Sequence, residues 1–171
     1  MAENINQSHL EREYAKYHFA SFGFSECGEY LDIYEKNSSC IQGSAHAFET
    51  AISKSFVITY ARPFTDNQGL GTLSDRWTRA LDERIRSLHN ALVGTGRNIL
   101  VAHMDVYELN ATIEVKGKRA GSFIFEWPIP MVNRNTIPML RELLDSATAF
   151  CEEKKDHLRS RITSAQIKLG P

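Results

Sequence analysis

Cysteine is scarce in this sequence. It occurs three times in 171 residues, as Cys27, Cys40 and Cys151, and no Cys-x-x-Cys or histidine-rich spacing accompanies it. These residues are too few and too scattered for a disulfide framework, and their spacing does not match a zinc site. We therefore expect reduced thiols, no metal site and no cofactor.

Long apolar runs and an excess of one charge are also lacking. No apolar stretch approaches the roughly 18–20 residues of a membrane span, and the polar segment Met1–Leu10 lacks the apolar core of a signal peptide. The 20 Lys and Arg residues face 21 Asp and Glu residues, which leaves a formal net charge of −1. No global field attracts a polyanion, so any nucleic-acid site must be a local patch. These features predict a soluble, cytoplasmic protein without a membrane contact.

Hydrophobic residues make up 42% of the chain, which is enough for a sizeable core. The length predicts one domain over residues 1–171, with a tail at about 163–171. Three segments place apolar residues at helical spacing. They are Ile41–Arg62, Asp75–Val93 and Ile137–Lys154.

Glycine marks the expected interruptions. The chain to about Phe19 is helix-compatible, whereas Ser21–Glu29 contains two glycines and is typical of a loop. Gly94 and Gly96 interrupt the second helical pattern, so we expect a kink or a new helix there, before the helix-compatible segment Arg97–His103.

Alternating apolar and polar residues predict a β-hairpin within Ala111–Trp127. An isolated hairpin is marginally stable in water, so its face of Phe123, Phe125 and Trp127 should pack on the helices or on a partner. The fold class we expect is mainly α, a helical bundle of four to five helices with an inserted β-hairpin at about 111–127.

The most informative segment is Arg97-Asn-Ile-Leu-Val-Ala-His103, which is followed by Met104-Asp105. It resembles the signature of the HEPN family (higher eukaryotes and prokaryotes nucleotide-binding), in which a few residues, the first of them polar, separate an arginine from a histidine. The string Tyr60-Ala-Arg-Pro-Phe64 is also similar to that family. The resemblance covers roughly Ile41–Asp105 and the C-terminal helix. It implies a helical homodimer whose two motifs face each other, and many members resemble metal-independent endoribonucleases.

The residue types agree with that chemistry. RNA cleavage through the 2′-hydroxyl needs a proton acceptor near neutrality, and an unperturbed histidine, with a pKa near 6.5, makes His103 the candidate. Arg97 is the permanent cation for the phosphorane, and Asn98 orients the histidine or a phosphate oxygen. The candidate substrate-binding residues are Tyr60, Arg62 and Asp105.

Helix geometry separates the two main candidates. At about 100° per residue, six positions leave Arg97 and His103 roughly 240° apart around an ideal helix. Either a helix break reorients one of them, or the site is composite, with His103 of one protomer near Arg97 of the other. We favour the composite site.

Purely structural interpretations of the same residues compete with these roles. Arg97 could pair with Asp105 or bind carbonyls, and His103 could simply satisfy a helix C-terminus. Arg62 could form a salt bridge that pins a loop. The segment Arg84–His89 repeats the arginine and histidine spacing, but its second residue is apolar, and it is typical of a solvated face.

The sequence therefore predicts a HEPN-type endoribonuclease, acting as a homodimer on RNA in stress or phage defence, with a neutralising antitoxin as a further partner. The alternative is a non-catalytic dimeric module that binds a nucleotide, RNA or a protein. The near-neutral charge favours the module, whereas the intact motif favours the enzyme. A purely structural dimer would leave the Arg97-Asn98 pair unexplained.

Overall fold

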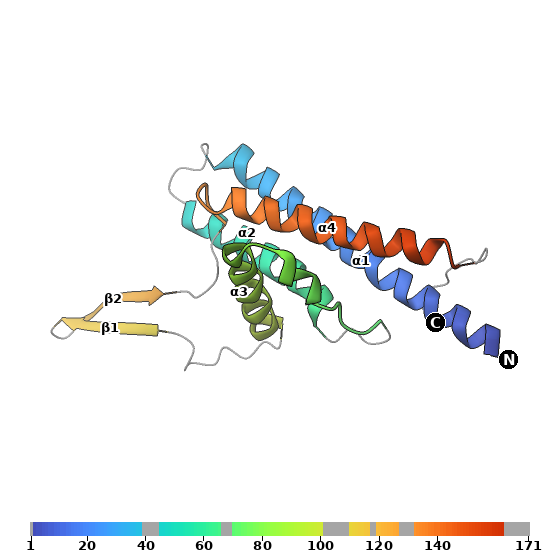
Figure 1. The fold of residues 1–171 in the computed structure, drawn as a ribbon. Helices are drawn as coiled ribbons and strands as arrows, with labels where there is room; N and C mark the ends of the chain where they lie inside the picture. Colours follow the sequence, from blue (N-terminus) through green and yellow to red (C-terminus); the bar gives the residue numbers. More distant parts are fainter. Residues whose placement is uncertain are drawn as a thin grey trace.

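Four α-helices dominate the computed structural model, so the prediction of a mainly α fold is confirmed. The structure describes residues 2–38, 45–65, 70–100, 110–116, 119–126 and 132–162, with side chains within 9–38, 47–65, 70–96 and 132–162. Figure 1 shows the helices α1 (Ala2–Asn37), α2 (Ala45–Ala61), α3 (Glu83–Leu100) and α4 (Ile137–Arg159). None of the described helices is long and apolar enough to span a membrane.

Helix α1 runs without a break through Ser21–Glu29, so the predicted loop is wrong. Two glycines destabilise a helix by about 2 kcal/mol relative to alanine. Burial of one large apolar side chain contributes about 1.5–3 kcal/mol, and this helix buries several, so burial outweighs the glycines. The buried side chains of this part of α1 recur at spacings of three and four: Ala20, Phe24, Cys27, Leu31 and Tyr34.

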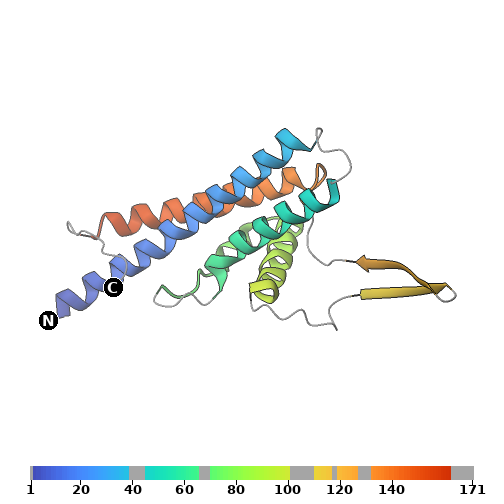
Figure 2. The same cartoon turned by 180° about the vertical axis from the view of Figure 1, so that it is seen from behind.

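Helices α1 and α4 lie side by side along most of α4 (Figures 1 and 2). The apolar face of α4 covers that of α1, and it comprises Ile137, Leu140, Leu143, Leu144, Ala147, Cys151 and Leu158. The predicted helix Ile137–Lys154 therefore continues to Arg159, because Leu158 and the stem of Lys155 are buried as well.

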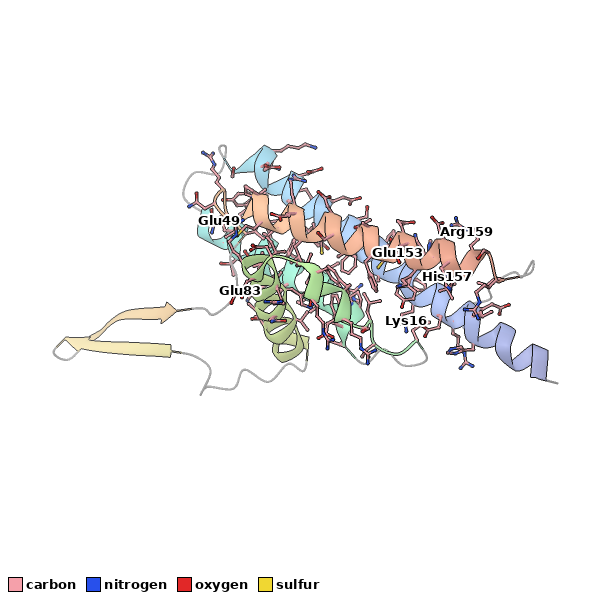
Figure 3. All side chains as sticks on the ribbon, viewed as in Figure 1. Lys16, Glu49, Glu83, Glu153, His157 and Arg159 are labelled. Carbon is pink, nitrogen blue, oxygen red and sulfur yellow. The ribbon has the colours of Figure 1, made fainter. Side chains whose placement is uncertain are left out.

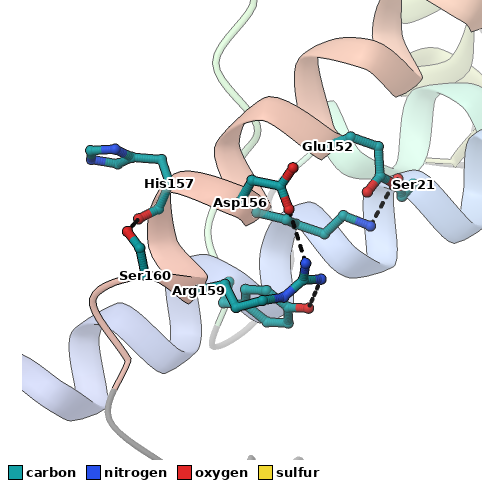
Figure 4. Close-up of polar contacts among 8 residues, drawn as sticks. Ser21, Glu152, Asp156, His157, Arg159 and Ser160 are labelled. Atoms are coloured by element: carbon teal, nitrogen blue, oxygen red, sulfur yellow. Dashed lines mark hydrogen bonds and ion pairs between the residues drawn. The ribbon is translucent and has the colours of Figure 1, made fainter.

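Polar contacts line the edge between α1 and α4. Arg141 forms ion pairs with Asp32 and Glu35 of α1. Towards the other end of α4, the Ser21 hydroxyl donates to Glu152 Oε1 at 2.8 Å (Figure 4). The guanidinium of Arg159 donates to the Tyr14 hydroxyl at 3.2 Å. These contacts join two helices that are far apart in the sequence.

The predicted helix over Asp75–Val93 is wrong in its first part. Arg76–Ala80 forms a short 3₁₀ helix, η2, and the backbone becomes extended at Leu81. Helix α3 begins at Glu83, where Asp82 Oδ1 accepts the backbone N–H of Arg84 at 2.8 Å. The aspartate satisfies a free N–H of the first turn, so it starts a new helix although the apolar spacing continues across the break.

Helix α3 continues through Gly94 and Gly96, so the expected kink or new helix is also wrong. Gly96 packs against α2: a Cβ placed on it would lie 2.1 Å from Ala61 Cβ and 3.0 Å from the Val57 carbonyl oxygen. The glycine therefore allows two helix backbones to approach closely, and it does not end the helix.

The predicted helix Ile41–Arg62 corresponds to α2, which ends at Ala61; residues 41–44 lie outside the described part of the chain. Arg62–Phe64 form a 3₁₀ turn, η1, in which Pro63 occupies an early position. Proline disfavours the helical conformation of the residue before it, which explains why the α-helix ends there.

Between α3 and α4, strands β1 (Asn110–Lys116) and β2 (Arg119–Glu126) pair antiparallel. The register joins Asn110 to Glu126 and Lys116 to Arg119, with an irregularity between Ile113 and Val115. Figures 1 and 2 show the two strands extending away from the helices. The side chains of the expected apolar face of the hairpin, Phe123, Phe125 and Trp127, lie outside the part that the structure describes.

Candidate functional site

The close contact between α2 and α3 joins two residues that each precede a candidate arginine. Ala61 of the first string packs against Gly96, which directly precedes the second string. Arg62 and Arg97 are the next residues along the two backbones, so the contact places their backbones at one corner of the bundle. The sequence alone could not join these strings, because 35 positions separate the arginines.

Arg97 and Asn98 occupy the last turn of α3, and their side chains lie outside the described part of the structure. His103 and Asp105 lie outside the described residues altogether. The expected angle between Arg97 and His103, and the composite site that we favour, therefore stay predictions.

Arg62 lies on the surface at the start of η1. Its carbonyl oxygen accepts hydrogen bonds from the Thr65 hydroxyl at 2.8 Å and the Thr65 N–H at 3.2 Å. The following Pro63 is buried, and its carbonyl accepts the Leu73 N–H at 2.7 Å. The turn that carries Arg62 is thus anchored on both sides, although its side chain faces solvent.

Tyr60 is fully buried and belongs to the core between α2 and α3. Its phenol oxygen lies 2.7 Å from Nδ1 of His89. Burial raises the pKa of Tyr60 well above its usual value, so the phenol stays protonated. The side chain of Tyr60 therefore lies in the core and does not face the candidate site. Only the backbone connects it to Arg62, two residues later.

The prediction of a solvated face for Arg84–His89 is wrong at its histidine. Arg84 is exposed, but His89 is only 1% exposed. His89 meets the rings of Phe64 and Trp77 edge to face, with centroids 4.8 Å and 5.6 Å away. Its spacing from Ile85 and Leu92, four before and three after, is the signal that could have placed it inside.

A polar cavity of about 480 Å³ opens beside His89. It lies between α3 and the segment that leads into η2, and its hydrogen-bonding side chains include Thr72, Ser74, Asp75 and Asn90. This cavity can accept a small polar molecule. Trp77 also packs against His89. Its indole N–H is buried without a hydrogen-bond partner in the described structure.

A second hollow, of about 330 Å³, lies where α1 meets the end of α2. Lys16, Phe19 and Phe22 of α1 line one side, and Thr59 and Arg62 line the other. Phe19 and Phe22 are among the large apolar side chains that the structure leaves exposed. Sequence reasoning missed both, because it assigned no role to α1.

The described residues that line the two hollows do not form a metal site. Across the described residues, no group of three or more His, Cys, Asp or Glu side chains is placed to hold a metal ion. Comparison of the chain with family models, curated proteins and solved structures gives no match.

Proposed function

We propose that this chain is a metal-independent endoribonuclease of HEPN type that works as a homodimer. The observation that supports it is the packing of Ala61 against Gly96, which brings the positions of Arg62 and Arg97 together at one corner. Two permanent cations near one point suit a phosphodiester whose charge increases in the transition state. The expected setting is the cytoplasm, in stress or phage defence, where an antitoxin would neutralise the enzyme.

In the proposed reaction, His103 takes the proton of the RNA 2′-hydroxyl. The 2′ oxygen attacks phosphorus and the bond to the 5′ oxygen breaks, so the products carry a 2′,3′-cyclic phosphate and a 5′-hydroxyl. The imidazolium returns its proton to the leaving 5′ oxygen. Arg97 stabilises the phosphorane with a forked pair of N–H donors, and Asn98 orients His103 or a phosphate oxygen. Arg62 contacts a neighbouring phosphate.

The buried pair of Tyr60 and His89 has a positioning role in this proposal. Tyr60 lies two residues before Arg62, and His89 lies on α3 two turns before Arg97, so their hydrogen bond fixes the two helices that carry the arginines. Tyr60 therefore supports substrate binding without touching the substrate, and Asp105 remains a candidate for direct contact.

The test is cleavage of mixed single-stranded and structured RNA in the presence of EDTA. Loss of a general base lowers a rate by about 10²–10⁴-fold, so His103→Ala should nearly abolish cleavage while leaving the circular dichroism spectrum unchanged. Arg97→Ala should act similarly. Arg84→Ala is the matched control, because Arg84 is an exposed arginine of the same helix and belongs to the repeated spacing.

Three outcomes would contradict the proposal. Cleavage that EDTA abolishes would exclude a metal-independent reaction, and full activity of His103→Ala would exclude the site. A wild-type protein that binds RNA or a nucleotide tightly without cleaving would instead fit the non-catalytic module.

The homodimer has its own test. A composite site needs a second copy, so light scattering at micromolar concentration should give about twice the 19.4 kDa of one chain. Mixing His103→Ala with Arg97→Ala protomers should restore part of the activity, because one of the two composite sites then carries both residues intact. A mass near that of one chain, with cleavage retained, would exclude the shared site.

A further inference from the structure

The hollow between α1 and the end of α2 has a composition that the fold itself does not require. Its two aromatic side chains, Phe19 and Phe22, are 47% and 67% exposed. Phe24 of the same helix is buried in the core, so Phe19 and Phe22 are not needed to fill the core next to it. An exposed pair at i and i+3 lies on one face of a helix, where both rings can meet the same ligand.

Two cationic side chains line the hollow. They are Lys16 and Arg62, and the described residues that line it include no Asp or Glu. Figure 3 shows Lys16 on α1, and its ammonium also pairs with Glu13 at 2.7 Å, which reduces its net effect. Arg62 lies on the opposite wall, at the end of α2. The hollow thus combines aromatic faces with a modest positive charge.

Arg62 also links the hollow to the proposed catalytic corner. Its neighbour Ala61 packs against Gly96 of α3, whereas Thr59 and Pro63 line the hollow beside α1. The end of α2 therefore lies between the hollow and the proposed catalytic corner. A single RNA strand could reach both, and Arg62 lies between them.

We propose that this hollow binds single-stranded RNA by stacking unpaired bases on Phe22 and Phe19, while Lys16 and Arg62 contact the backbone phosphates. Aromatic side chains beside cations are the usual means by which proteins hold single strands without reading their sequence. A duplex offers no free base faces to these rings. That the bound strand is the substrate rests on the proposed nuclease function, whereas the binding itself does not.

The experiment measures binding separately from cleavage. Fluorescence anisotropy with a labelled oligouridine and a blunt RNA duplex of the same length is carried out on His103→Ala, which should not cut either. We expect binding to the single strand in clear preference to the duplex. Phe22→Ala should weaken single-strand binding about tenfold, and Phe22→Trp should preserve it, because stacking contributes about 1–3 kcal/mol per base.

Ile33→Ala is the matched control. Ile33 is an exposed apolar residue of the same helix, 42% exposed, and it does not line the hollow. Its removal should leave RNA affinity unchanged. Affinity should fall with salt: the two phosphate contacts of the hollow alone give a slope of log K against log salt of about −1.4 for a single strand.

Unchanged affinity in both Phe22→Ala and Phe19→Ala would overturn the proposal, as would equal binding of the duplex. If Phe22→Ala left RNA binding intact but halved the mass by light scattering, the surface would be an interface between copies of the chain, and the proposal would be wrong. Binding that depends on Phe22, found in a wild type that cleaves nothing, would uphold the hollow and refute the nuclease.

Discussion

The phenol oxygen of Tyr60 and Nδ1 of His89 form a 2.7 Å hydrogen bond in the core, between α2 and α3. Both residues are removed from solvent, at 0% and 1% exposure. Both groups are buried, so loss of either one leaves the other without this partner, and the bond joins the helices more firmly than a surface contact would. Other aromatic rings surround it, since Tyr60 and His89 both contact Phe64, and His89 contacts Trp77.

Tyr60→Phe should lower the free energy of unfolding by about 1–3 kcal/mol, because it leaves a buried imidazole nitrogen without its partner. Urea denaturation measures the change. In a His89→Leu background the same substitution should have a smaller effect, since both polar groups are then gone. Tyr30→Phe is the control: its hydroxyl bonds Glu26 at a partly exposed site, and water can replace that bond. Equal effects in the two backgrounds would show that the pair is not coupled.

Gly96→Ala should destabilise the protein by about 1–3 kcal/mol, because the new methyl group would overlap Ala61 and push α2 from α3. It should also reduce RNA cleavage, since the same contact brings the backbones of Arg62 and Arg97 to one corner. Gly94→Ala, two residues earlier, meets nothing within 4 Å and should stabilise α3 by up to about 1 kcal/mol. Thermal melts of both variants measure this. Similar stability changes in the two would contradict the close approach.

Stability should decline in alkaline solution. Burial raises the pKa of Cys151 from its usual 9 to about 12, and it raises the pKa values of Cys27 and Tyr60 as well. The unfolded chain loses these protons first, so stability is complete below about pH 9 and falls as pH rises towards 12. Urea midpoints from pH 7 to 11 measure the decline. Stability of Cys151→Ala should decline less steeply with pH. An unchanged decline would contradict the attribution of part of it to the Cys151 thiol.

Arg97→Lys should recover only part of the RNA cleavage that Arg97→Ala loses. Lysine restores the charge, but a single ammonium replaces the planar fork that binds two phosphate oxygens at once. Single-turnover rates with saturating RNA compare the three proteins. Full recovery would mean that Arg97 acts only through its charge.

The mainly helical class was predictable from the spacing of apolar residues in the segments that form α2 and α4. Helices α2 and α4 were predicted within a few residues at the ends that can be compared. The missed features depend on contacts between distant segments. Ser21–Glu29 is helical although it contains two glycines, because its buried side chains pack on other helices, and no local pattern shows that packing.

The break before α3 shows a different limit. Leu73, Trp77, Leu81 and Ile85 continue at a spacing of four, as in one helix, yet Asp82 begins a new one. Periodicity indicates which residues face inward, but it does not show that the chain between them stays helical. The placement of the Arg62 and Arg97 backbones at one corner is likewise a tertiary result, since it depends on Gly96 meeting α2.

The reach of the paired strands and of α1 affects how the protein travels through a column. A compact domain of this length has a radius of gyration of about 15 to 16 Å. Here β1 and β2 extend from one end of the bundle, and the N-terminal turns of α1 pass beyond α4 at the other (Figure 2). Such a particle diffuses slowly for its mass. A single copy will therefore elute from a gel-filtration column earlier than a sphere of equal mass, and elution volume alone would overstate the number of subunits.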